Sequence, residues 1–208
     1  DPYSASKAAA EIAIHSYIAS YFPLKKTKVL IGIARAGNVV GGGDWSKDRL
    51  IPDSVKSWSK NKKVLVRSPN STRPWQHVLE ALNGYLLLAI KIKKNHKLHG
   101  EAFNFGPETK KNYKVIEVLK KMKEHWVKVS WKLATRKNFY ESNLLKLNSK
   151  KARIKLGWQS ILSFEETIKM ISEWYKAYYS IRKNLVEQLT LKQIKYYEKL
   201  LKKKMKIN

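Results

Sequence analysis

Hydrophobic and polar residues follow helical and strand periods in turn along the chain. Residues Tyr3 to Tyr21 carry alanines and isoleucines near helical spacing, and this run ends before Pro23. Lys28 to Arg35 is almost continuously apolar, as is typical of a strand buried on both faces of a parallel sheet. The same patterns predict helices at 53–60, 77–92, 113–125, 149–156 and 163–179, and strands at 63–66, 102–106 and 127–131. The alternation predicts an α/β protein.

Local signals mark the last predicted helices. Gly157 follows the helix at 149–156 as a C-terminal stop, and Ser163 with Glu166 forms a capping box at the start of 163–179. Residues 184–206 place leucines and isoleucines among many lysines. We expect this segment to be an amphipathic helix on its own domain, while a membrane-surface or partner helix is the alternative.

The composition limits the class of protein. The 208 residues, 43% of them hydrophobic, suit one domain or one and a half. Without cysteine the chain can form neither a disulfide nor a thiolate metal site, and the five histidines show no ligand spacing, so we predict no metal. No apolar run approaches the roughly 20 residues of a membrane span, and we expect a cytoplasmic protein.

The first residues contain a candidate acid/base pair. Tyr3 and Lys7 are four residues apart, so a helix places them on one face. A nearby cation favours the phenolate and lowers the pKa of a phenol from roughly 10 toward the working range. The alternative is an ordinary helix start, with Pro2 in the first turn, Ser4 or Ser6 as the cap, and Lys7 in water.

Further motifs follow in a fixed order. The predicted strand leads from Arg35 into Asn38-Val39-Val40-Gly41, then into Gly42-Gly43-Asp44-Trp45, and later comes the block from Arg73 to Val78. From residue 1 to about residue 198 the chain resembles the extended short-chain dehydrogenase/reductases, the NAD-dependent epimerase/dehydratase family. Within that family, the glycine-rich turn and the Arg73 block are similar to a sugar-nucleotide dehydratase.

The resemblance implies the rear part of a Rossmann-like parallel sheet plus a small C-terminal α/β lobe that binds substrate. Residues 1–180 are then a partial domain, with the lobe built mainly from 38–75 and 105–180, and 181–208 is a basic amphipathic C-terminal helix. No glycine-rich dinucleotide loop follows a strand anywhere in the sequence. We therefore expect only the C-terminal part of such a protein, inactive in isolation.

The activity implied by the resemblance is dehydration of CDP-glucose to a 4-keto-6-deoxy sugar nucleotide with NAD as cofactor. Tyr3, assisted by Lys7, would remove the proton of the glucose 4-hydroxyl, and Lys7 would also bind the nicotinamide ribose. The family's acid and base for elimination lie upstream of the motifs present here. An epimerase or a dehydratase of another nucleotide sugar stays open as an alternative.

Two residues are the main substrate-binding candidates. Arg73 matches the family's arginine that pairs with the nucleotide diphosphate, and guanidinium binds phosphate oxygens in bidentate fashion. Asn38 follows a strand, where open α/β sheets bind ligands, and its amide both donates and accepts hydrogen bonds. The alternatives are a surface arginine and a turn asparagine.

Other candidates are weaker. Trp45 and Arg49 lie in the loop after the glycines, and Glu141 falls where the family often closes over the nucleotide. We expect Asp44 to hold its loop together and His77 to be structural at a helix start.

The net charge of +27 suggests a different class of function, a non-catalytic basic module that binds polyanions. However, the lysines are spread along the whole chain without a helix-turn-helix, zinc-finger or aromatic-basic RNA motif. We therefore expect no specific nucleic-acid partner, and a positive field that attracts a nucleotide sugar. The resemblance also implies a homodimer.

Overall fold

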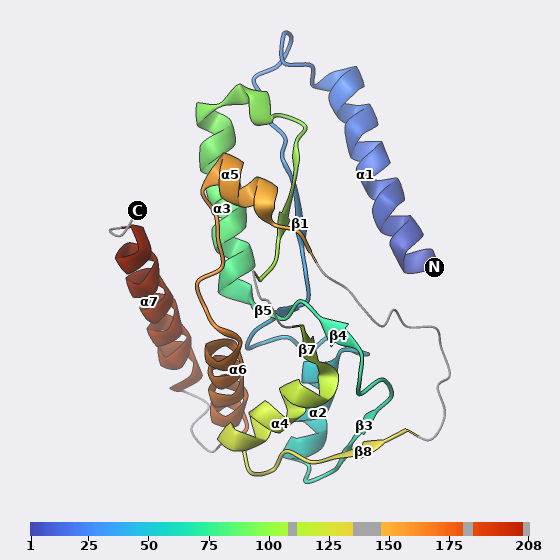
Figure 1. Cartoon of the computed structure of the whole chain (residues 1–208), viewed down its shortest axis with the longest axis vertical. Coiled ribbons are helices and arrows are strands. Elements are labelled where there is room, and N and C mark those ends of the chain that lie inside the picture. Colours follow the sequence, from blue (N-terminus) through green and yellow to red (C-terminus); the bar gives the residue numbers. More distant parts are fainter. Residues whose placement is uncertain (108–111, 135–146, 181–184, 206–208) are drawn as a thin grey trace.

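A computed structural model describes residues 1–107, 112–134, 147–180 and 185–205 (Figure 1). Its elements in chain order are α1 Pro2–Tyr21, β1 Ile33–Ala36, β2 Val39–Val40, α2 Leu50–Ser59, β3 Val64–Val66, β4 Thr72–Arg73, β5 Gln76–His77, α3 Val78–Lys94, the 3-10 helix η1 His96–Leu98, β6 Ala102–Phe105, β7 Tyr113–Lys114, α4 Val115–His125, β8 Trp131–Leu133, α5 Lys150–Leu156, α6 Phe164–Tyr178 and α7 Val186–Met205.

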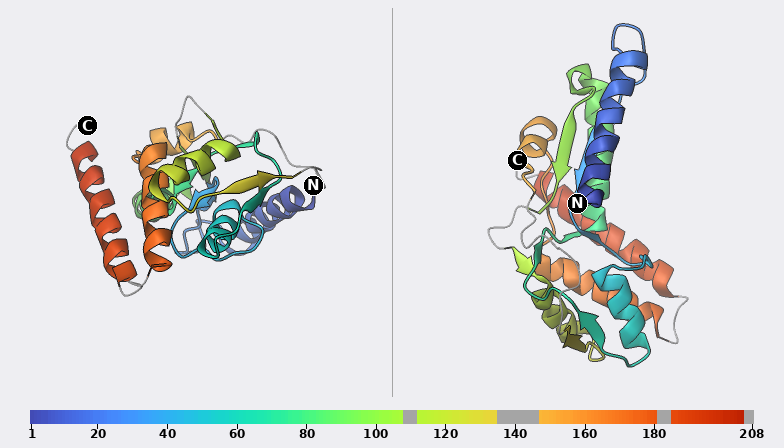
Figure 2. Two further views of the ribbon diagram at one scale, coloured as in Figure 1. Left: turned by 90° about the horizontal axis from the view of Figure 1, so that it is seen from below. Right: turned by 90° about the vertical axis from the view of Figure 1, so that its right-hand side faces the viewer.

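One part of the molecule is built on the parallel pair of β1 and β6. Ile33 lies opposite Ala102, and the register continues to Ala36 and Phe105. Helices α3 and α5 pack against this strand pair. Helix α1 runs alongside the pair on its other side (Figures 1 and 2). The buried apolar residues that join these elements are Leu88, Ile92, Leu98, Phe103, Phe105, Ala152, Leu156 and Trp158.

A second part contains three short strand pairs and three helices. β2 pairs with β5 and β3 with β8 in parallel, whereas β4 pairs with β7 antiparallel. Helices α2, α4 and α6 pack around them, and their core contains the largest group of buried apolar residues, with Trp58, Leu119, Met122, Ile168 and Tyr175 fully buried. Helix α7 lies along the outside of α6 (Figures 1 and 2).

The predicted α/β class and most helices are confirmed. Ser163 accepts a hydrogen bond from the Glu166 amide, and the Glu166 side chain accepts one from the Ser163 amide, as a capping box requires. Gly157 ends α5 with a φ of 75°, a left-handed conformation that favours glycine. Helix α7 packs on its own fold, as expected.

Three predicted boundaries were wrong. β1 begins at Ile33, because Ile31 bonds instead to the side chain of His99 and the amide of Gly100. β8 lies at 131–133, where the chain pairs with β3, while residues 126–129 form a turn. α2 begins at Leu50, because a proline in the first helical turn loses no intrahelical hydrogen bond.

Most apolar residues of α1 are exposed. No residue of this helix is buried, and Ile12, Tyr17 and Tyr21 are 70%, 61% and 68% exposed. Within the described part of the chain, nothing covers this helix face.

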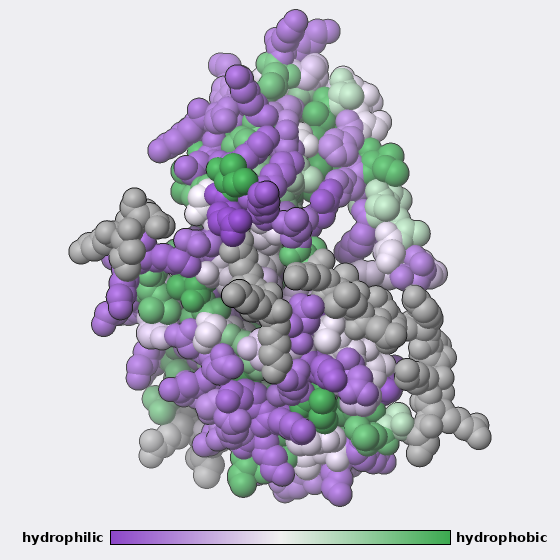
Figure 3. Space-filling model, viewed as in Figure 1, coloured by the Kyte–Doolittle hydropathy of each residue, from purple (hydrophilic) through white to green (hydrophobic). Residues whose placement is uncertain are grey.

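The surface is mainly hydrophilic on the face drawn in Figure 3, as the lysine content requires. Among the described residues, no helix combines the length and the apolar character that crossing a membrane requires.

A substitution at Gly84 tests the packing between α3 and β6. A Cβ at Gly84 would lie 2.4 Å from Cδ1 of the buried Phe105 ring. Alanine gains about 1 kcal/mol in helix propensity, but overpacking a core costs about 1–3 kcal/mol. We expect Gly84→Ala to lower the free energy of unfolding measured in urea by about 1–2 kcal/mol.

The exposed Lys93 on the same helix is the control. Lys93→Ala is expected to change the free energy of unfolding by less than about 0.5 kcal/mol. A Gly84→Ala variant more stable than the parent would show that this contact is absent.

Candidate functional site

The start of α1 holds the candidate acid/base pair. The Asp1 carboxylate caps the helix by accepting from the Ser4 amide at 2.9 Å, so the cap is Asp1 rather than Ser4 or Ser6. Tyr3 is 72% exposed, and Lys7 Nζ lies 5.4 Å from the centroid of its ring. The spacing therefore places the cation against the phenol ring, as a helix predicts.

An ion pair joins α1 to the strands. The Glu11 carboxylate accepts from Arg35 Nε at 2.7 Å and also from Arg35 Nη2, and Arg35 Nη1 donates to Asn104 Oδ1 at 3.3 Å. The hydrogen bond from Arg35 holds the pKa of Glu11 below its usual range. This contact fixes α1, one turn beyond Lys7, relative to β1 and β6.

Asn38 lies in the turn between β1 and β2, at the carboxyl end of β1. It is half-buried, and its carbonyl accepts from the Gln76 amide at 3.0 Å. The preceding Gly37 leaves room for the Pro74 ring, because a Cβ there would lie 2.8 Å from Pro74 Cγ. The parallel pairing of β2 with β5 thus brings Asn38 beside the chain that follows Arg73.

The glycine-rich loop is held by its own polar groups and by α6. Asp44 accepts from the Ser46 amide at 3.0 Å and from Arg49 Nη1 at 3.2 Å. Burial opposes the charge on Asp44, but these hydrogen bonds and the Arg49 charge lower the pKa of its carboxyl group overall. The Tyr175 hydroxyl lies 2.9 Å from the Asp44 carbonyl and 3.1 Å from that of Gly41. The expected role of Asp44 in holding its loop is confirmed.

Trp45 packs into a cluster of rings from the end of α6. Its ring lies 4.7 Å from the Tyr178 ring and 5.5 Å from that of Tyr175, measured between centroids. Gly42 faces Trp174 in the same cluster, where a Cβ would come within 2.1 Å of the indole ring. This packing accounts for a glycine at position 42 and for the placement of Trp45. Contact between Trp45 and substrate stays a prediction.

Arg73 ends the short strand β4 and lines a pocket. Its partner across the antiparallel pair is Tyr113, and its Nη1 donates to the Thr72 carbonyl at 2.8 Å. The pocket is lined by Arg73, Pro74, Trp75, Gln76, Glu80, Pro107, Tyr113, Ser160, Leu162, Phe164 and Thr167. A guanidinium group in this lining is suited to an anionic ligand.

Two buried polar residues follow Arg73. Gln76 donates to the Phe105 carbonyl at 2.8 Å, and within the described structure its Oε1 has no partner. His77 caps α3 by accepting from the Leu79 amide at 3.3 Å, which confirms its expected structural role. Burial lowers the pKa of His77 to about 4, so its imidazole is neutral near pH 7.

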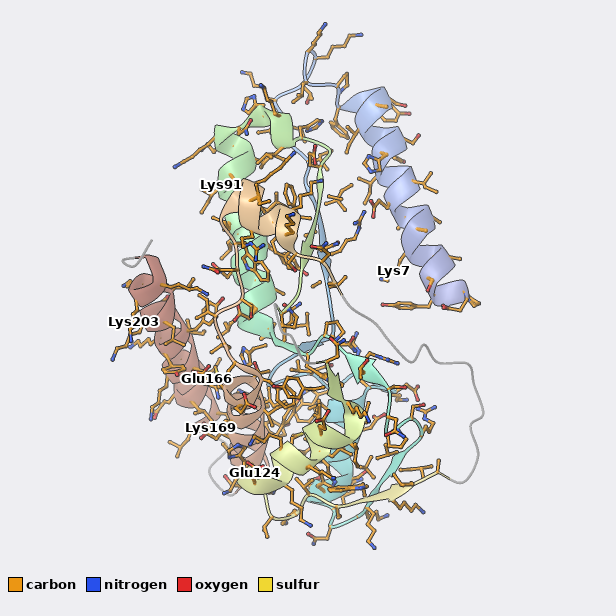
Figure 4. The ribbon with its side chains drawn as sticks, viewed as in Figure 1. Lys7, Lys91, Glu124, Glu166, Lys169 and Lys203 are labelled. Atoms are coloured by element: carbon orange, nitrogen blue, oxygen red, sulfur yellow. The ribbon has the colours of Figure 1, made fainter. Side chains whose placement is uncertain are left out.

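The candidates fall into two groups. The pairing of β2 with β5 brings the segment of Asn38 beside the segment that follows Arg73, and Trp45 and Arg49 share the neighbouring loop. Tyr3 and Lys7 lie in the first turns of α1, near the N-terminus of the described chain (Figure 4). Glu141 lies outside the described residues, and the described ranges contain no group of three potential metal ligands.

Sequence reasoning missed the buried supports of this region. Glu80 is 1% exposed and lines the pocket, while Tyr175 is fully buried under the glycine-rich loop. In the sequence Glu80 looks like an ordinary acidic residue in a first helical turn, where it complements the helix dipole. Only the tertiary fold shows that it is buried.

Fold and motifs together define a Rossmann-type protein of the epimerase/dehydratase class. The family model described as GDP-mannose 4,6 dehydratase matches residues 1–171, and the chain belongs to this family. The match spans every predicted site residue.

Curated relatives agree with this assignment. CDP-glucose 4,6-dehydratase of Salmonella typhimurium is 41% identical over 182 residues, which are 86% of this chain and 51% of the relative. Human dTDP-D-glucose 4,6-dehydratase is 25% identical over 196 residues, covering 91% of this chain and 52% of the relative. The chain thus spans about half the length of these relatives. The predicted resemblance to sugar-nucleotide dehydratases is confirmed.

Solved structures confirm the fold class. UDP-glucuronic acid 4-epimerase from Bacillus cereus, in complex with UDP-glucuronic acid and NAD, superposes with a TM-score of 0.69 at 19% identity, over 85% of this chain and 52% of that one. dTDP-glucose 4,6-dehydratase from Bacillus anthracis, in complex with NAD, gives 0.63 at 21% identity, over 89% and 55%. At these identities the likeness concerns the fold alone.

The low pKa of His77 predicts a pH-dependent stability. The unfolded chain protonates a histidine near pH 6.5, whereas the folded chain does so only near 4. The histidine therefore costs no stability above pH 6.5, and stability is lost as the pH falls from 6.5 to 4, by up to about 3 kcal/mol. We expect His77→Asn, which keeps a capping oxygen but does not titrate, to remove this part of the pH dependence.

The measurement is the free energy of unfolding in urea between pH 4 and 8, for both proteins. If the two curves run parallel over this range, His77 takes up its proton at the same pH in the folded and the unfolded chain, and our description of its burial is wrong.

Proposed function

We propose that this chain is the substrate-binding part of an NAD-dependent sugar-nucleotide 4,6-dehydratase acting on CDP-glucose. The observation that carries the proposal is the 41% identity to the Salmonella CDP-glucose 4,6-dehydratase over 86% of the chain. The family match from residue 1 to 171 supports it, because the matched range contains Tyr3, Lys7, Asn38 and Arg73.

Arg73 and Asn38 would bind the nucleotide sugar. Arg73 lines the pocket, and the paired N–H groups of a guanidinium match the oxygens of a diphosphate. Asn38 lies at the carboxyl end of β1, where sheets of this class bind ligands, and its amide suits a sugar hydroxyl. Arg49, Trp45 and Glu141 remain weaker candidates for contacts with the same ligand.

Tyr3 and Lys7 would perform the acid/base step. The Tyr3 phenol is exposed, and the ammonium group of Lys7 lies over its ring. Tyr3 would take the proton of the sugar 4-hydroxyl, and Lys7, with three N–H donors, suits the ribose hydroxyls of NAD. A bound NAD would supply the chemistry of accepting a hydride from the sugar and giving it back.

This proposal requires groups beyond the described residues. No glycine-rich dinucleotide loop follows a strand in the sequence, and the implied elimination acid and base are not among its motifs. We therefore propose that activity depends on a nucleotide-binding half that completes the sheet. The exposed apolar face of α1, with Ile12 and Tyr17, supports an additional packing partner.

Assembly and location are proposed on the same basis. We infer a homodimer and a cytoplasmic location from the resemblance to the family. An epimerase, or a dehydratase of another nucleotide sugar, is the alternative in the same family, since the solved structures of this fold include both activities. Polyanion binding by the dispersed lysines is an alternative of a different class.

Turnover tests the proposal. We would fuse this chain behind the part of the Salmonella enzyme that it does not match, and assay CDP-glucose with NAD. We expect a CDP-4-keto-6-deoxy sugar as product. Tyr3→Phe is expected to lower turnover about 100-fold or more, because it removes the acid/base group.

Tyr196→Phe is the control, since it removes a hydroxyl from an exposed tyrosine on α7, a helix that carries none of the candidate residues. This variant should keep full turnover. A product epimerised at C4 would support the epimerase instead, and full turnover by Tyr3→Phe would exclude Tyr3 as the acid/base residue.

A further inference from the structure

Helix α7 lies beyond the family match, which ends at residue 171, yet it reaches the interior of the fold. Tyr197 on this helix is 4% exposed, and its hydroxyl donates to Glu80 Oε2 at 2.8 Å. Gln193, one turn earlier, donates to the Met170 carbonyl of α6 at 2.9 Å. The inner face of α7 is thus fixed by specific hydrogen bonds as well as by apolar packing.

Glu80 is the point where three segments meet. Its Oε1 accepts from the Ile161 amide at 2.7 Å, the Leu162 amide at 2.6 Å and the Ser160 hydroxyl at 3.3 Å, while Oε2 is bonded to Tyr197. Burial raises the pKa of Glu80, and these four donors oppose that rise. A buried carboxyl group that loses one of its donors is costly, so the contacts depend on one another.

This network forms one wall of the pocket that Arg73 lines. Glu80, Ser160 and Leu162 face the same pocket as Arg73 and Gln76. The amide oxygen of Gln76 is buried there without a partner in the described structure. The residues held by Tyr197 therefore line the same pocket as Arg73.

The same helix supports the glycine-rich loop. Thr190 accepts a hydrogen bond from Trp174 Nε1 at 2.8 Å, and the Trp174 ring packs directly on Gly42. Helix α7 therefore supports both segments that carry substrate-binding candidates. It holds Glu80, which follows the Arg73 segment, and Trp174, which packs on the glycine-rich loop.

We propose that Tyr197 is a positioning residue for the nucleotide-sugar site, holding Glu80 and the 160–162 segment so that this wall of the pocket lined by Arg73 is fixed. The inference rests on the proposed function for the identity of the ligand. It goes beyond that function in assigning a role to α7, which the family match does not include.

Two variants of adjacent tyrosines test this role. Tyr197→Phe removes the hydroxyl that donates to Glu80. Tyr196→Phe removes a hydroxyl that donates to Glu166, in the first turn of α6 (Figure 4). We expect Tyr197→Phe to speed amide exchange at Ile161 and Leu162 about tenfold and to weaken CDP binding, measured by calorimetry, about five- to tenfold. Tyr196→Phe should change neither quantity more than twofold.

Unchanged amide exchange and unchanged affinity for CDP in Tyr197→Phe would overturn the inference. A lower unfolding temperature with unchanged affinity for CDP would also overturn it, because Tyr197 would then stabilise only the fold. If Tyr197→Phe does not fold, the parent chain decides: CDP should slow exchange at Ile161 and Leu162, and no effect on them overturns the inference. If the parent chain does not bind CDP, the proposed function fails, while the exchange comparison still decides whether Tyr197 fixes this wall.

Discussion

The buried carboxyl group of Glu80 joins the parts of this structure. It lies in the first turn of α3, its side chain accepts four hydrogen bonds, and its carbonyl accepts a fifth from Trp158 at 3.3 Å. Removing a carboxyl group from water costs several kcal/mol unless donors replace the lost hydration. Here the donors come from the 160–162 segment and from α7, so the cost is offset only when α3, the 160–162 segment and α7 are in place together.

That arrangement also determines where the candidate site lies. Because α3 begins directly after β5, fixing its first turn fixes the chain between Arg73 and His77. β5 in turn pairs with β2, which follows Asn38. The aromatic end of α6 holds the glycine-rich loop from the other side, through the Tyr175 hydroxyl and the ring of Trp174. The substrate-binding candidates are therefore placed by the buried faces of α3 and α6, two helices that contribute no candidate of their own.

The sequence predicted the helices well, because their periodicity and caps are local. The Ser163 and Glu166 capping box and the left-handed Gly157 depend only on neighbouring residues. The strands were predicted less well, since β1 and β8 begin where a partner strand is available, and the two-residue pairs of β2 with β5 and β4 with β7 have no period to detect.

The candidate site shows the same division. The spacing of Tyr3 and Lys7 and the family motifs indicated the residues that carry chemistry, and local sequence placed His77 at a helix start. Burial of Glu80, Tyr175 and Tyr197 arises from contacts between residues more than 80 positions apart, for which a single sequence contains no signal. The exposed face of α1 likewise could not be foreseen, because its apolar pattern is that of a packed helix.

The most direct test of this account is a crystal structure of the chain with CDP-glucose bound. We predict that the diphosphate lies against the Arg73 guanidinium, with the sugar directed toward Asn38 at the carboxyl end of β1. A nucleotide sugar bound elsewhere, with Arg73 free of phosphate contacts, would contradict the assignment of this pocket and the role given to the helices behind it.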